Sequence, residues 1–541
     1  MMLLKTRYWL GIIALMVLVA VVGGYKLGSV PHGMTWDEAA IGYNGYAVIT
    51  TRRDEWLVRL PISFQSFGDY KAPLAIYLNG FFTTVLGMKL WVVRLPFLLM
   101  AISSVIPLIG LFTHLLKEVE TDEKKRQTFA LIGGLAYVTS PWFLTFSRTG
   151  FESGISQALV IWGLYFLYIF LDEPVSKKMR SLFSHNVLPL LLGVLGIVGS
   201  MYSYHSAKVV APGIILLLLA LNFKKITKVK ALYLVAALAL SLLLLRPLII
   251  DMFWGKGSQR FQQTTIFNKG LTTDSLVKES ASQFADHLSP SFLISGETTS
   301  LRHGDGKWGV LLVTVFALVV FGAVATLSPK YRRIGVFSML WIAGALLPAA
   351  VGVDSPHSNR SLLALPGLII LAVIGSHWLH QKVQDSMLVD KVAVIKSIFG
   401  TCLLLHAVLF VAYQRHYYTD YAAQSATEFN DGYLEAFQEV IPYEKGLNGK
   451  PQAEIIVFTT DYDQPYIYAL FMRRTNPIWY QGGSLNTYLF INSLTESELV
   501  RKNAVIVGSA MDSLPVEKAD KIIYGSDGSV RFKIYFTFDK N

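Results

Sequence analysis

Residues 35–46 read T-W-D-E-A-A-I-G-Y-N-G-Y, and they begin a few residues beyond the first long apolar segment of the chain. The adjacent carboxylates Asp37 and Glu38 stand at the start of this stretch. Residues 67–74, F-G-D-Y-K-A-P-L, close it and place Asp69 and Lys71 before a second amphipathic run. Acids, a lysine and aromatic rings gathered just outside a bilayer indicate a site rather than a tether.

The composition is that of a membrane protein. Of 541 residues, 53% are hydrophobic and only 16% are charged, which is far more apolar than an ordinary soluble domain. We expect about eleven transmembrane helices between Tyr8 and Ala412, because each needs about 20 mostly apolar residues. The first apolar run is long and has a weak cleavage site, so we interpret it as a retained helix rather than a signal peptide.

The net charge of +11 reflects topology rather than nucleic-acid binding. Basic residues concentrate in alternating loops, such as 117–126, 177–180 and 330–333. The positive-inside rule makes these loops cytoplasmic. We therefore predict a multi-pass protein of the plasma membrane, with a cytoplasmic N-terminus and an extracytoplasmic C-terminal domain. The single cysteine, Cys402, allows no intramolecular disulfide.

The predicted fold is mainly α and polytopic, with two domains. Residues 1–412 form the transmembrane region, which carries large external loops at about 30–89 and 251–307. Residues 39–51 and 74–86 show helical spacing and are expected to be amphipathic helices at the interface. Residues 413–541 form a soluble α/β domain, about the usual size of one domain. In that domain we predict helices at 428–440 and 495–502, and strands at 454–459, 504–508, 521–524 and 530–536.

The ionisable residues outside the basic loops fall on one side of the predicted topology. Ionisable groups at a membrane boundary are costly unless they are paired or solvated, and so they suggest function. Tyr204 accompanies them in the loop Y-S-Y-H-S-A-K at 202–208. The set is Asp37, Glu38, Asp69, Lys71, Arg148, Glu152, His205, Lys208, Arg302, His303, Asp354, His357 and Arg360.

Carboxylates mixed with cations at an outer leaflet suit a lipid-phosphate-linked sugar as substrate. The lipid tail lies in the bilayer, the phosphate needs Lys, Arg or protonated His, and the anomeric carbon reacts when an acceptor is deprotonated. A carboxylate then supplies the base, and the cations stabilise the leaving phosphate. This chemistry needs no nucleotide site, and we identify none in the sequence.

The same motifs carry a family resemblance. T-W-D-E-A at 35–39, followed by Y-K-A-P-L at 70–74, resembles the first external loop of the GT-C superfamily of polyprenyl-phosphate-sugar-dependent glycosyltransferases. The likeness is to the branch of protein O-mannosyltransferases and the lipid A aminoarabinose transferase. S-R-T-G-F-E at 147–152 is similar to the second acidic motif of that branch. P-H-S-N-R at 356–360 is similar to a late external turn of some bacterial members.

The resemblance implies roles for individual residues. It makes Asp37 the general base, or the acid that orients the acceptor, with Glu38 beside it and Glu152 as the second catalytic acid. Lys71 becomes a phosphate contact, and Arg148 a residue that positions Glu152. We add Asp69, Tyr204, His205, Arg302, His303, His357 and Arg360 as substrate-binding candidates. Ala72 stands where the aminoarabinose transferases usually have a first proline, which bears on the sugar and acceptor more than on the fold.

Structural explanations compete with these roles. Asp37 and Glu38 could cap the helix that starts near Ala39, Lys71 could be an interfacial lysine, and Arg148 with Glu152 could form a structural ion pair. The loop histidines do not make a metal signature. Two other functions also stay open. One is a lipid or solute transporter or flippase, and the other is a non-catalytic envelope-assembly protein that acts through its C-terminal domain.

The expected function is transfer of a sugar from a polyprenyl-phosphate donor to an extracytoplasmic protein, lipid or glycan acceptor, with inversion at the anomeric carbon and Asp37 as the base. The expected partners are the donor, the acceptor and membrane lipids, with no nucleic acid. A divalent cation beside Asp37 stays open as a cofactor, although acids clustered with Lys and Arg need no metal for charge balance.

Overall fold

The computed structural model describes residues 2–172, 187–227, 229–257, 259–386, 390–480 and 485–538. The predicted basic loop at 177–180 lies outside these residues. The chain divides into two compact units, and each draws on separate stretches of sequence. Unit 1 comprises residues 1–25, 69–74 and 97–415, and unit 2 comprises residues 26–68, 75–96 and 416–541.

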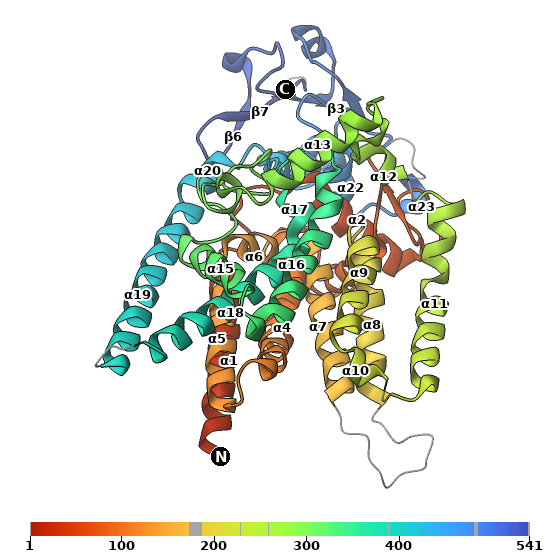
Figure 1. Ribbon diagram of the computed structural model, residues 1–541. Helices are drawn as coiled ribbons and strands as arrows, with labels where there is room; N and C mark the ends of the chain where they lie inside the picture. Colours follow the sequence, from red (N-terminus) through yellow and green to blue (C-terminus); the bar gives the residue numbers. More distant parts are fainter. Residues whose placement is uncertain are drawn as a thin grey trace. The chain divides into compact units, whose positions relative to one another are not determined.

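Unit 1 is a bundle of apolar helices (Figure 1). Eleven predicted apolar segments are helical here over most of their length, because long apolar runs satisfy their backbone groups internally. The helices are α1 (Met2–Gly24), α4 (Leu90–Leu115), α5 (Glu123–Val138) with α6 (Pro141–Ser147), α7 (Glu152–Asp172), α8 (Val187–Ser203), α9 (Ala207–Leu221), α11 (Ala231–Trp254), α15 (Val313–Ala325), α16 (Pro329–Ala350), α18 (Leu365–Gln384) and α19 (Lys391–Tyr418).

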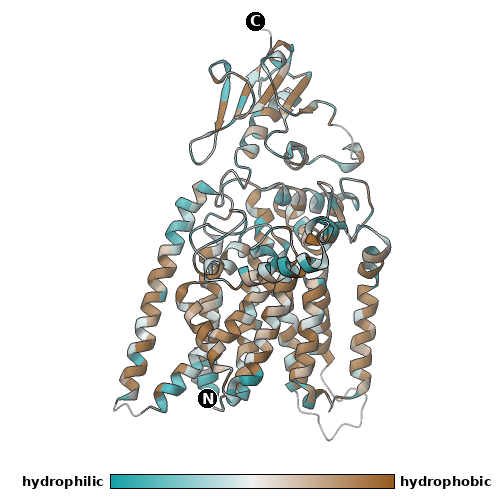
Figure 2. Ribbon diagram, turned by 45° about the horizontal axis from the view of Figure 1, so that its top comes forward, coloured by the Kyte–Doolittle hydropathy of each residue, from teal (hydrophilic) through white to brown (hydrophobic). Residues whose placement is uncertain are grey.

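The chain is a multi-pass membrane protein. Seven helices in the described residues are long and apolar enough to cross a membrane, or eight if the bent pair α5 and α6 is one span. Helices α8, α9 and α15 are apolar but shorter, so the predicted number of eleven crossings remains a prediction. Figure 2 shows that the long helices carry mainly apolar residues along their length.

Helix α18 forms the centre of unit 1. Most of the span that contains it is buried, whereas the spans that contain α1, α11 and α19 bury little of their surface. Helix α18 packs against α5, α15 and α16, and α7 packs against α8. Short elements join the long helices: β2 (Asp69–Lys71), η1 (Leu116–Glu118), α10 (Phe223–Ile226), α12 (Gln259–Thr264), η2 (Ile266–Asn268), α13 (Thr273–Asp286), α14 (Pro290–Leu293), α17 (Ser358–Ser361) and η3 (Leu362–Ala364).

Unit 2 is built on a five-stranded mixed sheet. Its strand order is β4-β3-β5-β7-β6, with β3 parallel to β4 and β5, and β7 antiparallel to β5 and β6. The predicted turn at Ser526–Ser529 joins β6 to β7. The strands are β3 (Ile455–Thr459), β4 (Tyr488–Ile491), β5 (Ala504–Ser509), β6 (Lys521–Tyr524) and β7 (Val530–Phe536). The predicted domain boundary near residue 412 remains a prediction.

Helices pack on this sheet and share its core. They include two that are distant in sequence, α2 (Trp36–Thr51) and α22 (Pro465–Arg473), which pack together. The remaining elements of unit 2 are β1 (Phe64–Ser66), α3 (Pro73–Leu86), α20 (Asp420–Gln424), α21 (Tyr433–Lys445), α23 (Pro477–Tyr480), η4 (Glu496–Val500) and η5 (Val516–Lys518). The predicted helix at 495–502 is thus a short 3₁₀ turn.

Helix α2 differs from the amphipathic interface helix that its spacing predicted. Ala40, Ile41, Tyr43 and Val48 are all buried although they lie on different sides of the helix. The reason is that α2 contributes to the apolar core of unit 2 together with residues of the C-terminal sheet. Its small residues allow this close packing on several sides.

Candidate functional site

The predicted acid pair stands in the first turn of α2. Thr35 is the N-cap: its side-chain oxygen accepts a hydrogen bond from the Glu38 backbone N–H (3.1 Å), and Glu38 Oε2 accepts one from the Thr35 backbone N–H (3.1 Å). This reciprocal pair is a capping box. The alternative explanation of Glu38 as a helix cap is therefore confirmed in its geometry, while Asp37 is half-buried beside it.

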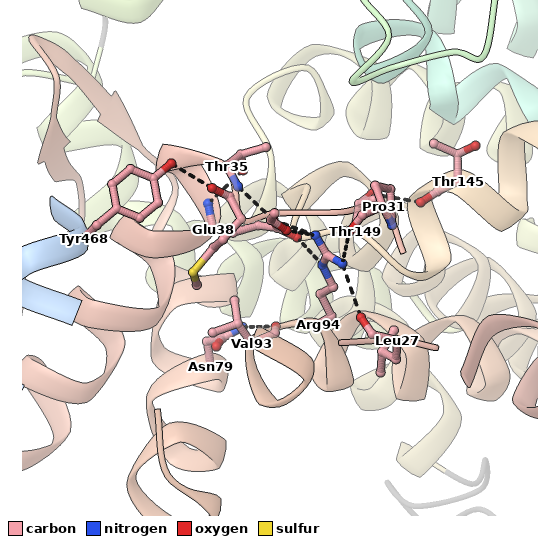
Figure 3. Close-up of polar contacts among 12 residues, drawn as sticks. Leu27, Pro31, Thr35, Glu38, Asn79, Val93, Arg94, Thr145, Thr149 and Tyr468 are labelled. Atoms are coloured by element: carbon pink, nitrogen blue, oxygen red, sulfur yellow. Dashed lines mark hydrogen bonds and ion pairs between the residues drawn. The ribbon is translucent and has the colours of Figure 1, made fainter. Parts of the chain in front are cut away.

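Glu38 is also half of a buried ion pair (Figure 3). Arg94 Nε donates to Glu38 Oε1 (2.7 Å), and Arg94 Nη2 donates to Glu38 Oε2 (3.1 Å). Both side chains have an exposed fraction of 1% or less. A two-pronged, desolvated contact of this kind fixes the carboxylate in one orientation. Glu38 therefore has a structural role as cap and ion-pair partner, and Asp37 stands beside it in the first turn of α2.

Arg94 additionally holds the segment that leads into α2. It donates to the backbone carbonyls of Leu27 (3.2 Å), Pro31 (3.0 Å) and Gly33 (2.9 Å). The hydroxyl of Tyr468 on α22 donates to the carbonyl of Met34 (2.7 Å), just before the N-cap (Figure 3). The backbone on which Asp37 sits is therefore anchored from both sides within unit 2.

In unit 1, the strand β2 presents Asp69, Tyr70 and Lys71 to two residues of distant segments. Asp69 Oδ2 forms an ion pair with Arg260 Nη1 (2.8 Å). The Tyr70 carbonyl accepts a hydrogen bond from His205 Nε2 (3.0 Å). Lys71 is buried. Two contacts on consecutive residues fix the strand, and with it the position of the Lys71 backbone.

His205 is neutral in this arrangement. Its Nε2 donates to Tyr70, so its Nδ1 accepts the hydrogen bond from Lys208 Nζ (3.3 Å). Burial, with Lys208 and Arg260 nearby, holds the pKa of His205 well below its usual value. A neutral imidazole orients the strand but supplies no positive charge to a phosphate.

A second group of predicted residues surrounds Tyr204. The phenol is buried, which raises its pKa, while Arg260 and Arg360 oppose the shift and Glu152 adds to it. Arg360 Nη2 lies 3.7 Å from Asp354 Oδ2. Its Nη1 is buried and has no hydrogen-bond partner among the described residues. A guanidinium in that condition is an incomplete site for an oxyanion.

Three histidines lie together beside Arg360. The rings of His303 and His357 lie with centroids 4.4 Å apart and planes tilted by 35°, and the ring of His303 also contacts that of Phe151 (5.0 Å). His287 Nε2 accepts a hydrogen bond from the His357 backbone N–H (2.9 Å). His357 Nδ1 accepts one from the Arg360 backbone N–H (3.4 Å) and so caps α17. Burial lowers the pKa of His357 well below its usual value.

Arg148 and Arg302 make the following contacts with the backbone and with a neighbouring side chain. Arg148 donates from Nη1 to the Val22 carbonyl (3.1 Å) and from Nη2 to the Tyr25 carbonyl (2.7 Å). It thus satisfies carbonyls at the C-terminal end of α1. Arg302 is half-buried, and its backbone N–H contacts Ser300 Oγ (3.2 Å).

The sequence prediction missed several residues that organise these groups. Arg94 is a charged side chain in an apolar helix, which by itself signals a buried partner. Arg260 lies in the polar segment 251–307, where nothing local distinguishes it from other cations. His287 is marked by no motif. The described residues include no group of three or more His, Cys, Asp or Glu side chains arranged to hold a metal ion.

Comparison with known proteins identifies the fold. No protein-family model and no curated protein matches the chain. Among solved structures, ArnT from Cupriavidus metallidurans bound to undecaprenyl phosphate matches with a TM-score of 0.53 and 11% sequence identity, over 96% of this chain and 97% of that one. The chain therefore has the predicted GT-C-like fold.

Two further structures match more weakly. The apo state of the same ArnT gives a TM-score of 0.49 at 12% identity, over 96% and 97% of the two chains. The archaeal oligosaccharyltransferase AglB from Archaeoglobus fulgidus, in complex with an inhibitory peptide and a dolichol-phosphate, gives 0.47 at 13% identity, over 87% and 64%.

Proposed function

We propose that this protein is an integral membrane glycosyltransferase that moves a sugar from a polyprenyl-phosphate donor to an acceptor on the extracytoplasmic face. The observation that carries the proposal is the buried, unsatisfied Nη1 of Arg360 beside Arg260 and Tyr204. A phosphate oxygen would satisfy this donor, and a charged acceptor makes the stronger hydrogen bond. The GT-C type of fold, and the undecaprenyl phosphate bound to the ArnT of similar fold, support the same donor class.

The proposed phosphate site is cationic. Arg260 influences the pKa of His205, Tyr204 and His357, and Lys71 influences the pKa of His205. We therefore propose that Arg260, Arg360 and Lys71 contribute to one cationic site in unit 1. Asp69 balances part of this charge through Arg260. The excess of positive charge would stabilise the negative charge that grows on the leaving phosphate.

The proposed base is Asp37, in the first turn of α2. The acceptor O–H or N–H gives its proton to the Asp37 carboxylate. The acceptor atom forms a bond to the anomeric carbon while the bond from that carbon to the phosphate oxygen breaks, and polyprenyl phosphate leaves with the electron pair. A single displacement of this kind inverts the anomeric configuration. Glu152, near Tyr204, is proposed as the second acid.

Glu38 takes a different proposed role from Asp37. Both oxygens of Glu38 accept hydrogen bonds from Arg94 or Thr35, so we propose that it positions the first turn of α2 rather than taking up a proton. Arg148 likewise positions the end of α1. Tyr204, His205, His303 and His357 are proposed to line the donor site, and Arg302 is retained with them as a binding candidate.

The test is mass spectrometry of lipids that purify with the protein in native membrane. We compare the unmodified protein with Asp37→Asn and Lys71→Ala, and with the control Lys278→Ala, which removes an exposed lysine of α13. The proposal expects a polyprenyl phosphate or its glycosylated form in the unmodified, Asp37→Asn and Lys278→Ala samples, and its loss with Lys71→Ala. Bulk phospholipid alone in all four samples would contradict it.

A further inference from the structure

The turn at residues 476–480, N-P-I-W-Y, displays two large apolar side chains to the outside of unit 2. Trp479 has an exposed fraction of 85% and Ile478 of 48%. Isolated apolar residues on a surface need no explanation. Two adjacent exposed apolar side chains in one turn form a small apolar protrusion. We call this protrusion, Ile478 and Trp479, the Trp479 tip.

The Trp479 tip is held rigidly. Pro477 and Tyr480 on either side of it are buried, and Tyr480 stacks on Tyr466 with centroids 6.5 Å apart and planes 13° from parallel. Asn476 braces the turn: its Oδ1 accepts the Ile478 backbone N–H (3.0 Å) and its carbonyl accepts that of Trp479 (3.0 Å). The fold therefore fixes both apolar side chains outward.

The position of the turn in unit 2 relates it to a membrane boundary. A Cβ placed on Gly87 would lie 3.7 Å from Arg474 Nη2, and the Tyr43 hydroxyl donates to the Thr475 carbonyl (2.9 Å). Gly87 stands between the end of α3 and Leu90, where the candidate membrane span of α4 begins. The start of a span is expected at the surface of the bilayer, so we expect the Arg474 guanidinium near that level, and the tip follows within five residues.

The surroundings of Gly87 have the composition of an interface. Phe81, Val85 and Leu86 on α3 are exposed and apolar. Lys89 and Arg474 are exposed and basic. Tryptophan together with flanking basic residues is the usual combination at the boundary between acyl chains and headgroups.

We propose that the Trp479 tip inserts into the headgroup region of the outer leaflet and anchors the C-terminal sheet of unit 2 to the bilayer surface. The occupant of this surface is lipid: Ile478 and Trp479 meet the acyl-chain boundary, and Arg474 with Lys89 meets anionic headgroups. Because α22 carries Tyr468 and is followed three residues later by α23, which carries the tip, the anchor sets the depth of the network around Arg94. The inference does not depend on the proposed sugar transfer.

The experiment measures depth directly. In a Cys402→Ser background, a nitroxide is attached at Trp479→Cys, and separately at Val500→Cys and Met511→Cys, which are exposed positions in the same unit. The protein is placed in nanodiscs of phosphatidylcholine and phosphatidylglycerol. We expect the label at 479 to be relaxed more by oxygen than by a nickel chelate, and the labels at 500 and 511 to show the reverse. A label at 479 that behaves like the one at 511 would overturn the proposal.

A second measurement covers a labelled variant that does not fold. Tryptophan emission of the unmodified protein is compared with that of Trp479→Phe in nanodiscs with and without brominated lipid. We expect the difference spectrum, which reports Trp479 alone, to fall at least twofold with brominated lipid and to resist iodide. A difference spectrum that iodide quenches and bromine leaves unchanged would show that the tip faces water.

Discussion

Arg94 and Glu38 form a two-pronged ion pair inside unit 2, at N–O distances of 2.7 Å and 3.1 Å, with both side chains excluded from solvent (Figure 3). They belong to different helices, α4 and α2. Arg94 also donates hydrogen bonds to three backbone carbonyls, those of Leu27, Pro31 and Gly33. One guanidinium therefore fixes the segment that leads into the acid pair of α2.

Removal of one member of this pair should destabilise the protein more than removal of both. Arg94→Ala leaves the Glu38 carboxylate buried without its partner, at a cost on the order of 3–5 kcal/mol. In Arg94→Ala/Glu38→Gln the lone charge is gone, so we expect a smaller loss. The measurement is the thermal unfolding midpoint in detergent, read from intrinsic fluorescence.

Two controls accompany that comparison. Thr35→Ala removes the cap but leaves the ion pair, and should cost only about 1 kcal/mol. Arg501→Ala removes half of a more exposed pair with Glu498, and should change stability by about 1 kcal/mol or less. A double variant that unfolds at or below the midpoint of Arg94→Ala would contradict a dominant role of the buried charge.

Asp37→Asn should abolish turnover while leaving the protein folded. A positioned general base typically contributes about 10²–10⁴-fold to the rate, and Asn keeps the size of the side chain without its basicity. The measurement is release of free polyprenyl phosphate from the donor that purifies with the protein. Asp274→Asn, an exposed carboxylate in α13, is the control. Full turnover in a folded Asp37→Asn variant would remove Asp37 from the mechanism.

The sequence predicted the helical region well, because length and apolar composition decide where membrane helices form. It missed β4 and α22, which are short and have no clear periodicity. It also could not place α2, since the fold of unit 2 joins Tyr43 to Thr475 through a hydrogen bond that spans most of the chain. Local patterns contain no information about such a pairing.

The candidate site shows the same division. The chemistry-bearing residues were visible as acids, cations and histidines in the predicted external segments, and Arg260 pairs with one of them, Asp69, and influences the pKa of Tyr204, His205 and His357. Their partners were not visible. Asp69 pairs with Arg260 of a distant segment, and Glu38 pairs with Arg94 of another helix. Roles follow from such contacts, which only the folded chain displays.

Arg360→Gln should weaken donor binding more than it slows chemistry. The change removes a buried cation whose Nη1 has no acceptor among the described residues, so a phosphate loses one charge-assisted hydrogen bond, worth about 1.5–3 kcal/mol. We expect KM for the donor to rise about 10–100-fold, with a smaller change in kcat. Lys269→Gln, which removes part of an exposed pair with Glu279, is the control. A normal KM would exclude Arg360 from the phosphate site.

Stability should fall as the pH drops below the usual histidine value of about 6.5, and His357 should contribute to this fall. Burial holds the pKa of His357 well below that value in the folded state, so the unfolded chain binds the proton first. The stabilisation is therefore complete above about pH 6.5 and is lost progressively at lower pH. The measurement is the thermal midpoint between pH 7.5 and 5.

His357→Asn provides the matched comparison for the pH experiment. Asparagine keeps an N-cap acceptor for the Arg360 backbone N–H but has no proton to gain. We expect this variant to lose less stability than the unmodified protein over the same pH range, while its midpoint at pH 7.5 stays close to normal. An identical slope in both proteins would show that His357 does not titrate within that window.

Gly80→Ala should disrupt the crossing of α2 and α3, which pack at Gly45 and Gly80. A Cβ on Gly80 would lie 2.2 Å from the Gly45 carbonyl oxygen and 2.6 Å from its carbonyl carbon. Backbone atoms cannot move aside as a flexible side chain can, so the helices must separate, at a cost of about 1–3 kcal/mol or more.

Gly344→Ala is the matched control in α16, because nothing lies within 4 Å of its added methyl group. That control should be neutral or slightly stabilising, since alanine is the better helix former by about 1 kcal/mol. The measurement is the thermal unfolding midpoint of both variants under the same conditions. Equal midpoints for the two variants would show that the α2–α3 crossing has room for a methyl group at Gly80.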